Sequence, residues 1–302
     1  DVVNVTNGIL YNSLDGLSRI RFKNGCSLAI IEGNTLTGES KIRDNNAGFV
    51  DIASGIVNNT LTNGSDILCQ LAVLSGGLNQ NNLSNGIFKL ISGTFTDVMA
   101  NTFINSSADF TAASNGSLSN NKFTNVANLN CTGGFSFANF DYNTFLDTDI
   151  VLDFSGGSNI QAFTNNYISN PITLFEVKVA NIPVFTNNQV INCDTFSANL
   201  VSMGNITSNS VLDNAIFNIN GTNQIDFEIS QNSIDTNSSL LIDATATLIA
   251  TGSIYRNTIK VESVLDFRGS TIYLFYENII TNNCAIDLGG IDGTPTWFIN
   301  GY

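Results

Sequence analysis

The chain has 302 residues, of which 43% are hydrophobic and only 12% are charged, so it can bury a large core. Its formal net charge is −14 and it contains no histidine, a balance that argues against nucleic acid or an anionic membrane as a partner. No run of 18 apolar residues occurs, so we expect no segment to cross a membrane.

The first recognisable element is a short pattern at Ile9, Asn12 and Leu14: an apolar residue, two variable residues, an asparagine, one variable residue and a second apolar residue. The pattern recurs along the chain at intervals of 20 to 25 residues. Its asparagines are Asn12, Asn34, Asn59, Asn81, Asn101, Asn121, Asn143, Asn166, Asn188, Asn209, Asn232, Asn257, Asn278 and Asn300. A fixed period of this length indicates that each repeat is one supersecondary unit, which buries its apolar face by stacking on its neighbours.

The segments between the asparagines are predicted to be short strands. Runs such as 151–154 and 264–267 alternate in polarity and are rich in Val, Leu and Phe, and clusters of Gly or Asn separate them. Only three prolines occur, and no apolar series persists at helical spacing. Each repeat is therefore predicted to be one coil of two or three strands, with the next coil about 4.8 Å away.

The repeated asparagine is predicted to lie at a corner of each coil. Asparagine tolerates the left-handed backbone conformation that a sharp bend requires. Stacked once per coil, its amide can donate to one neighbour and accept from the other, which satisfies a buried polar column. A second, looser column follows four residues later and comprises Asn63, Asn85, Asn105, Asn125, Asp147, Asn170, Asn192, Asp213 and Asn282.

This asparagine ladder and the coil length resemble right-handed parallel β-helix proteins of the pectate-lyase-like superfamily, such as phage tailspikes and surface β-solenoid proteins. The resemblance covers nearly all of the chain. It implies an all-β fold in which residues 1–302 form a single right-handed parallel β-helix of about 13–14 coils. It is a likeness of architecture, which by itself names no activity.

The pattern reaches both ends of the sequence, since Ile9 belongs to the first copy and Trp297, Asn300 and Tyr302 form the last. We therefore expect the solenoid to lack its own end caps. A bare end would expose apolar side chains and unpaired backbone groups. The predicted partners are other copies or neighbouring chains that cover the ends, in a homo-oligomer or a filament.

Three aspartates, Asp243, Asp266 and Asp287, lie at similar places in three successive repeats. If Leu265 and Phe267 point inward, Asp266 points outward, because side chains alternate along a strand. A column of outward carboxylates could act as an acid/base pair on a glycan or contribute to a calcium site. The alternative is a solvated strand face whose charges nearby Arg and Lys balance. The three aspartates are the candidate catalytic residues.

Aromatic residues near the corners are the candidates for ligand binding, because aromatic rings on a polar surface often hold sugars. They are Tyr167, Tyr255 and Tyr276, with Arg256 and Arg268 in the coils of the aspartates. The alternative is that the rings only pack against the coil. Carbohydrate is the predicted ligand.

Neither a metal nor a cofactor is predicted. The five cysteines are spread two or more coils apart and show no metal-binding spacing. The absence of histidine and the small number of basic residues do not support the galacturonan hydrolase or lyase activities known for this fold.

We therefore expect a rigid structural or adhesive protein outside the cell, on a cell surface or on a virion, such as a fibre, tail appendage or filament subunit. The alternative is a tailspike-like polysaccharide hydrolase that uses paired outward carboxylates.

Overall fold

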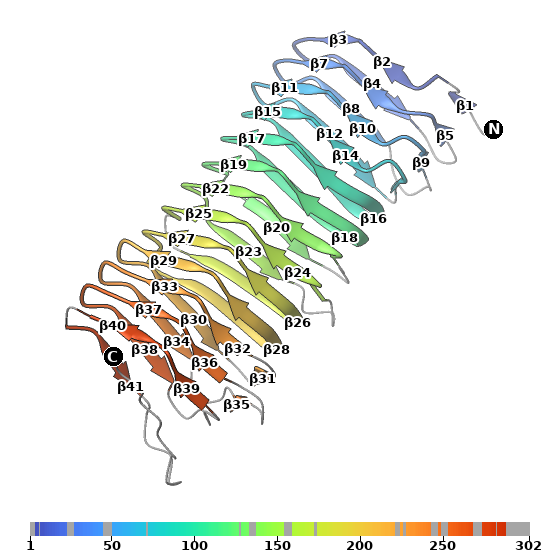
Figure 1. Ribbon diagram of the computed structural model, residues 1–302. Coiled ribbons are helices and arrows are strands. Elements are labelled where there is room, and N and C mark those ends of the chain that lie inside the picture. Colours follow the sequence, from blue (N-terminus) through green and yellow to red (C-terminus); the bar gives the residue numbers. More distant parts are fainter. Residues whose placement is uncertain are drawn as a thin grey trace. The chain divides into compact units, whose positions relative to one another are not determined.

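The computed structural model describes residues 4–5, 7–22, 27–44, 50–70, 72–126, 128–132, 137–153, 159–171, 174–220, 224–225, 228–242, 247–248, 253–267, 274–281 and 283–287. All regular structure in these residues is β-strand, and the strands pair in parallel. The predicted all-β fold is confirmed: the chain forms a parallel β-solenoid (Figure 1). The described ranges contain no helix that could cross a membrane.

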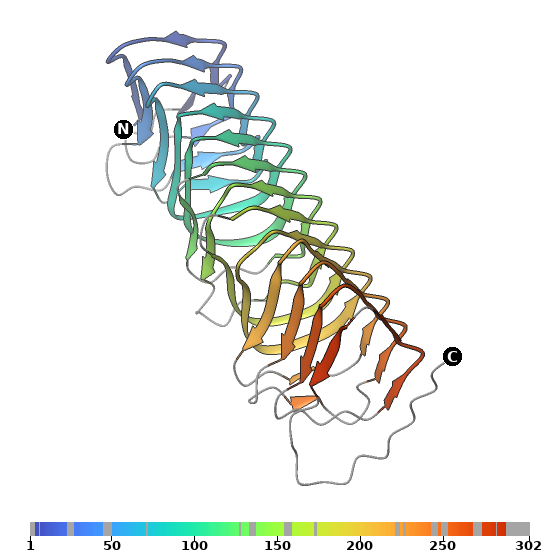
Figure 2. The same cartoon turned by 90° about the vertical axis from the view of Figure 1, so that its left-hand side faces the viewer.

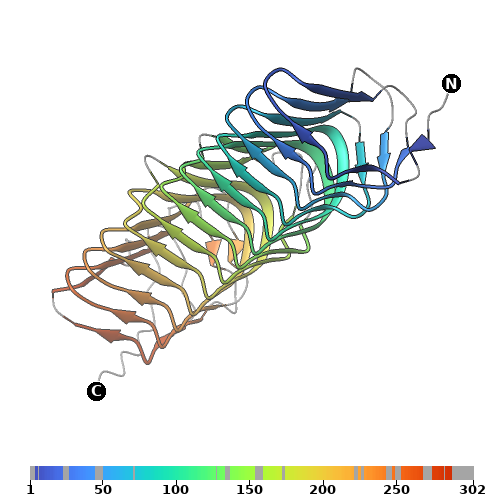
Figure 3. The same ribbon diagram turned by 90° about the horizontal axis from the view of Figure 1, so that it is seen from above.

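The chain divides into two compact units, residues 1–156 and 157–302. Within each unit the coils follow one another in chain order (Figure 2 and Figure 3). Each repeat contributes one strand to a smaller sheet, seven strands in the first unit and six in the second. The repeats predicted at Asn12 to Asn278 are thus present, and the one at Asn300 lies outside the described residues.

In the first unit a larger sheet precedes the asparagine corner in each coil and the smaller sheet follows it. The larger sheet contains β1 (Asn4–Val5), β2 (Ile9–Leu10), β4 (Arg19–Phe22), β5 (Ser27–Leu28), β6 (Ile31–Glu32), β8 (Lys41–Asp44), β9 (Val50–Ile52), β10 (Ile56–Val57), β12 (Asp66–Gln70), β13 (Ala72–Leu74), β14 (Leu78–Asn79), β16 (Ile87–Met99), β18 (Ser107–Ser119), β20 (Asn128–Thr132), β21 (Asn139–Asp141) and β23 (Ile150–Asp153). The smaller sheet contains β3 (Ser13–Leu14), β7 (Thr35–Leu36), β11 (Thr60–Thr62), β15 (Asn82–Ser84), β17 (Thr102–Ile104), β19 (Lys122–Thr124) and β22 (Thr144–Leu146).

The second unit repeats this arrangement. Its larger sheet contains β24 (Ala162–Thr164), β26 (Phe175–Thr186), β28 (Phe196–Thr207), β30 (Ile216–Asn220), β31 (Gln224–Ile225), β32 (Glu228–Ser230), β34 (Ser239–Ile242), β35 (Thr247–Leu248), β36 (Ser253–Tyr255), β38 (Val264–Phe267), β39 (Leu274–Tyr276) and β41 (Ala285–Asp287). Its smaller sheet contains β25 (Tyr167–Ser169), β27 (Gln189–Ile191), β29 (Ser210–Leu212), β33 (Ser233–Ile234), β37 (Thr258–Ile259) and β40 (Ile279–Ile280).

The core of each unit is built from the apolar positions of the repeat. In the smaller sheet of the first unit, Phe103, Phe123 and Phe145 are in register and fully buried. Their rings stack at centroid distances of 4.9 and 5.0 Å, with interplanar angles of 5°. In the second unit Phe163 and Phe185 stack in the same way, 5.0 Å apart. Strand spacing thus sets the ring spacing, because identical side chains fall on one another at each coil.

The asparagine ladder is confirmed within each unit. In the first unit the side-chain Nδ2 of each ladder asparagine, from Asn12 to Asn121, donates to the Oδ1 of the next at 2.9 to 3.0 Å. In the second unit the bonds run from Asn166 to Asn278 at 2.9 to 3.1 Å. The inner members are buried, with Asn59 and Asn188 fully inaccessible.

Each ladder amide is satisfied by backbone groups as well as by its neighbours. The Oδ1 of Asn81 accepts from both Nδ2 and the backbone N–H of Asn59, at 3.0 and 2.9 Å. The Nδ2 of Asn81 donates to the backbone oxygen of Ile56 in the preceding coil at 2.8 Å. This bonding explains how a buried polar column is tolerated, because an unsatisfied buried polar group costs about 1–3 kcal/mol.

The predicted backbone role of the ladder asparagine is wrong. The left-handed residue is the one just before it, such as Tyr11 (φ 51°), Gln80 (φ 58°) and Ala100 (φ 54°), whereas no described ladder asparagine has a positive φ. The bend is made one residue earlier, and the asparagine serves through its side-chain amide. In the second column, by contrast, members such as Asn85 and Asn105 do adopt φ of 55° and 47°.

Candidate functional site

The predicted carboxylate column is only partly formed. Asp266 and Asp287 lie opposite each other on β38 and β41. The residue opposite Asp266 on the preceding coil is Leu241, not Asp243. Asp243 lies 23 residues before Asp266, whereas the two coils are offset by 25 residues, the interval between Asn232 and Asn257. Asp243 itself lies outside the described residues.

The predicted exposure of Asp266 is also wrong. Its residue is only 3% exposed, although its register with Leu241 places it on the side of the strand away from the core residue Leu240. A carboxylate so covered does not meet a polymeric substrate from solution. Within the described ranges, no group of three or more His, Cys, Asp or Glu residues is placed to hold a metal ion.

In the second unit, a different column of stacked residues shares one functional group, a side-chain hydroxyl. The residue two places before each ladder asparagine carries a hydroxyl group in all six described repeats of that unit. We call this set the hydroxyl column; it comprises Thr164, Thr186, Thr207, Ser230, Tyr255 and Tyr276. Its members are in register on β24, β26, β28, β32, β36 and β39.

The hydroxyl column lies on the outer side of the larger sheet. The residue before each member from Thr164 to Tyr255, such as Phe163 or Ile254, points into the core and is fully buried, and Phe275 before Tyr276 is half-buried. The hydroxyls of Thr186 and Thr207 share a hydrogen bond of 2.8 Å. Adjacent strands lie about 4.8 Å apart, which sets the spacing of the column. Ser230 is only 1% exposed, whereas the three threonines and the two tyrosines are half-buried and reach the surface.

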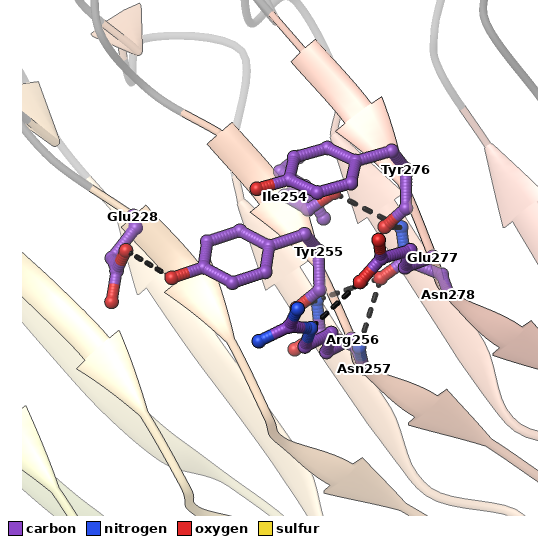
Figure 4. Close-up of polar contacts among 8 residues, drawn as sticks. All are labelled: Glu228, Ile254, Tyr255, Arg256, Asn257, Tyr276, Glu277 and Asn278. Carbon is purple, nitrogen blue, oxygen red and sulfur yellow. Dashed lines mark hydrogen bonds and ion pairs between the residues drawn. The ribbon is translucent and has the colours of Figure 1, made fainter.

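Two stacked tyrosines end the described hydroxyl column (Figure 4). The rings of Tyr255 and Tyr276 are half-buried and stack with centroids 5.0 Å apart and planes 8° apart. The phenol of Tyr255 donates to Oε2 of Glu228 at 2.6 Å, and the Ser230 hydroxyl donates to Oε1 of Glu228 at 3.2 Å. The hydrogen bond to the Glu228 carboxylate raises the pKa of Tyr255, because it favours the protonated phenol. Glu228 thus fixes two members of the column.

An exposed ion pair lies at the corner beside the tyrosines (Figure 4). The Nε of Arg256 donates to Oε2 of Glu277 at 2.7 Å, and this hydrogen bond raises the pKa of Arg256. The guanidinium carbon of Arg256 lies 5.8 Å from the centre of the Tyr255 ring, within the range of a cation–π contact. Aromatic, hydroxyl and charged groups therefore meet at one place on the surface.

Three of the five predicted ligand-binding residues, Tyr255, Arg256 and Tyr276, belong to this cluster. Tyr167 does not, since it lies on β25 of the smaller sheet, in register with Gln189. Arg268 lies outside the described residues. The sequence analysis did not identify Glu228 or the Thr and Ser members of the hydroxyl column. The Thr and Ser members could have been found from the sequence, because each lies two residues before a ladder asparagine.

An open cavity of about 610 Å³ lies in the first unit. It opens where the pairing of β16 with β18 shifts register near Phe95 and Asp97. Asp97 is the one carboxylate among its described lining residues, and its Oδ1 accepts from the backbone N–H of Ser117 at 2.9 Å. Glycoside hydrolysis ordinarily needs two carboxyl groups, so this described lining does not favour that chemistry.

Comparison of the chain with protein-family models, with curated proteins and with solved structures finds no match. What the surface can do follows from its own groups. Hydroxyls donate and accept hydrogen bonds, tyrosine rings offer an apolar face beside a polar tip, and the Arg256–Glu277 pair adds charged donors and acceptors. This combination suits a ligand that is itself rich in hydroxyl groups and carries apolar C–H faces.

Proposed function

We propose that the protein is a rigid structural or adhesive β-solenoid, outside the cell or on a cell or virion surface, which binds carbohydrate along the hydroxyl column. The observation that carries the proposal is the in-register row of six hydroxyl residues ending in the Tyr255–Tyr276 stack. The hydrogen-bonded ladder beneath holds the row in place, which lowers the ordering cost of binding.

The family relation that we propose is to pectate-lyase-like parallel β-helix proteins, a group that includes phage tailspikes and surface β-solenoid proteins. The parallel solenoid and its asparagine ladder support this relation. Function still depends on the surface columns, because one fold hosts many functions.

The test is a screen of oligosaccharides, followed by titration of the best ligand against wild type and two variants. Tyr276→Ala removes one ring of the stack, and we expect it to weaken binding about 2- to 10-fold, since an aromatic contact is worth about 0.5–1.5 kcal/mol. The matched control is Tyr167→Ala, which removes a half-buried tyrosine on the other sheet and should leave the affinity unchanged. Absence of any glycan ligand, or an equal loss in both variants, would contradict the proposal.

The hydrolase alternative has one supporting observation, the register of Asp266 with Asp287. It requires that the wild-type protein cleaves a polysaccharide and that Asp266→Asn abolishes cleavage without lowering the melting temperature. We expect instead binding without cleavage, because Asp266 is buried.

Association of copies into an oligomer or filament stays a prediction. Sedimentation velocity over a wide range of concentrations measures it directly. We expect the sedimentation coefficient to rise with concentration, and a constant monomer value would show that the prediction is wrong.

A further inference from the structure

A cluster of cations lies on the first unit, distant in sequence from the hydroxyl column. Arg19 and Arg21 alternate along β4, and Lys41 and Arg43 alternate along β8, with Arg19 opposite Lys41 and Arg21 opposite Arg43. We call these four residues the basic array. They make up four of the eleven basic residues of a chain whose net charge is −14.

The alternation directs these cations outward. Ile42, between Lys41 and Arg43, is fully buried, whereas Arg19 and Arg21 are exposed. Strand geometry places neighbouring members about 4.8 Å apart between coils and about 6.6 Å apart along a strand. The four side chains and Ile20 line a hollow of about 90 Å³. A water molecule takes about 30 Å³ of liquid volume, so the hollow can hold a group of several heavy atoms.

One side of the basic array already binds a carboxylate from the chain itself. Asp66 lies opposite Lys41 on β12, and its side chain is only 6% exposed. Nε of Arg43 donates to Oδ1 of Asp66 at 2.8 Å, and Nη2 of Arg43 donates to Oδ2. Nζ of Lys41 lies 3.6 Å from Oδ2. The hydrogen bonds to Asp66 raise the pKa of Arg43. Arg43 of the basic array therefore binds a carboxylate through two N–H donors at once, which is the bidentate geometry typical of arginine with an oxyanion.

The other side of the array has no such carboxylate within the described residues. Among the described side chains, Arg19 and Arg21 form no ion pair, and Asp66 is the one carboxylate that pairs with the array. Like charges held this close disfavour one another, and a bound anion relieves that repulsion.

We propose that Arg19 and Arg21, together with Lys41, bind a phosphate or sulfate group carried by a surface glycan. Each guanidinium offers five N–H donors in a planar fork, which suits the oxygens of a tetrahedral oxyanion. Two guanidinium groups and an ammonium also supply enough charge for a phosphate monoester, which carries about −1.5 to −2 at pH 7. Nucleic acid fits less well, because the residues that line the hollow include no aromatic ring on which a base could stack.

The experiment measures binding of inorganic phosphate and of dextran sulfate by calorimetry, at several salt concentrations, with neutral dextran, polygalacturonate and single-stranded DNA in parallel. The test variant is Arg19→Gln/Arg21→Gln. Its matched control is Lys89→Gln/Lys122→Gln, which removes the same charge from other coils of the unit. We expect the test variant to weaken dextran sulfate binding about tenfold or more, since hydrogen bonds to charged groups are lost, and the control to change it little.

A second variant separates binding from mere stability. Asp66→Asn removes the internal carboxylate that competes for Arg43 and Lys41, so we expect it to tighten the binding of dextran sulfate while the melting temperature stays equal or falls. Weaker binding in Asp66→Asn would overturn the proposal. So would equal losses in the two double variants, equally tight binding of polygalacturonate, or preference for single-stranded DNA. Binding of the free ions but not of dextran sulfate would also overturn it, by limiting the site to small ions.

Discussion

Replacing one inner rung of the asparagine ladder should cost far more than replacing a neighbour on the surface. In Asn188→Leu the side chain keeps its number of heavy atoms and its branching at Cγ, but the amide is lost. The Oδ1 of Asn188 accepts from the backbone N–H and from Nδ2 of Asn166, both at 3.0 Å. Its own Nδ2 donates to the backbone oxygen of Phe163 at 2.9 Å and to Oδ1 of Asn209 at 3.1 Å.

The magnitude follows from the groups that lose a partner. Two N–H donors on Asn166 are left without this acceptor in a buried column, and each such loss costs about 1–3 kcal/mol. The acceptors on Phe163 and Asn209 lose one donor, which costs less because Oδ1 of Asn209 still accepts from the backbone N–H of Asn188. We therefore expect a loss of about 2–6 kcal/mol in the free energy of unfolding.

The assay is urea unfolding, with hydrogen exchange at the Asn166 amide as a local readout, because a solenoid is stabilised by nearest-neighbour coils and need not unfold in two states. The control is Gln189→Leu, one residue away and exposed, which should change stability by less than about 0.5 kcal/mol. If Asn188→Leu and Gln189→Leu have the same midpoint and the Asn166 amide keeps its protection, the ladder does not stabilise the coils as we infer.

Two further predictions concern single contacts. In Glu228→Gln the pKa of Tyr255, raised by its hydrogen bond to the carboxylate, should fall toward the ordinary value of about 10; NMR of tyrosine labelled at Cζ would show an unchanged titration if this reasoning fails. Because the folded pKa lies above the unfolded one, this contact stabilises wild type below about pH 10 and its contribution is lost as the pH rises through the folded value. In Gly116→Ala the new Cβ would overlap the backbone carbonyl of Thr96, so the β16–β18 pairing must shift, and we expect thermal unfolding to show a loss of about 1–3 kcal/mol or more; an unchanged melting temperature would contradict it.

Much of the fold could be predicted from sequence because its signal is periodic. The ladder asparagines and the apolar residues around them recur with every coil, and burial of Phe123 between Phe103 and Phe145 is the direct result. The left-handed corner could not be found in this way. Asn58, Asn120, Asn165 and Asn187 at this position tolerate a positive φ, but Tyr11 and Ala100 at the same position have no such preference. Residue type alone therefore does not mark the corner in every coil.

The site was predicted less well, for two physical reasons. Alternation along a strand predicts the direction of a side chain but not what covers it, and Asp266 is buried although its register is that of an outer residue. Coil length also varies, so equal spacing does not ensure alignment: Asp266 pairs with Leu241, not with Asp243. Tyr255 and Tyr276 could be chosen as candidate ligand-binding residues because they are aromatic. Thr186 stands out only when the repeats are aligned on their ladder asparagines, which places it in register with Thr207.

The two units differ at one position of the repeat, and this difference locates function better than the fold does. Two residues before the ladder asparagine, the second unit has a hydroxyl in every described repeat. At the same position the first unit has Leu10, Glu32, Val57, Asn79, Met99, Ser119 and Asp141. Because these outer side chains do not enter the core, stacking of the coils tolerates any of these types, as the first unit demonstrates. The uniform chemistry of the hydroxyl column is therefore not required by the solenoid, and a ligand contacted along several coils supplies a reason for it.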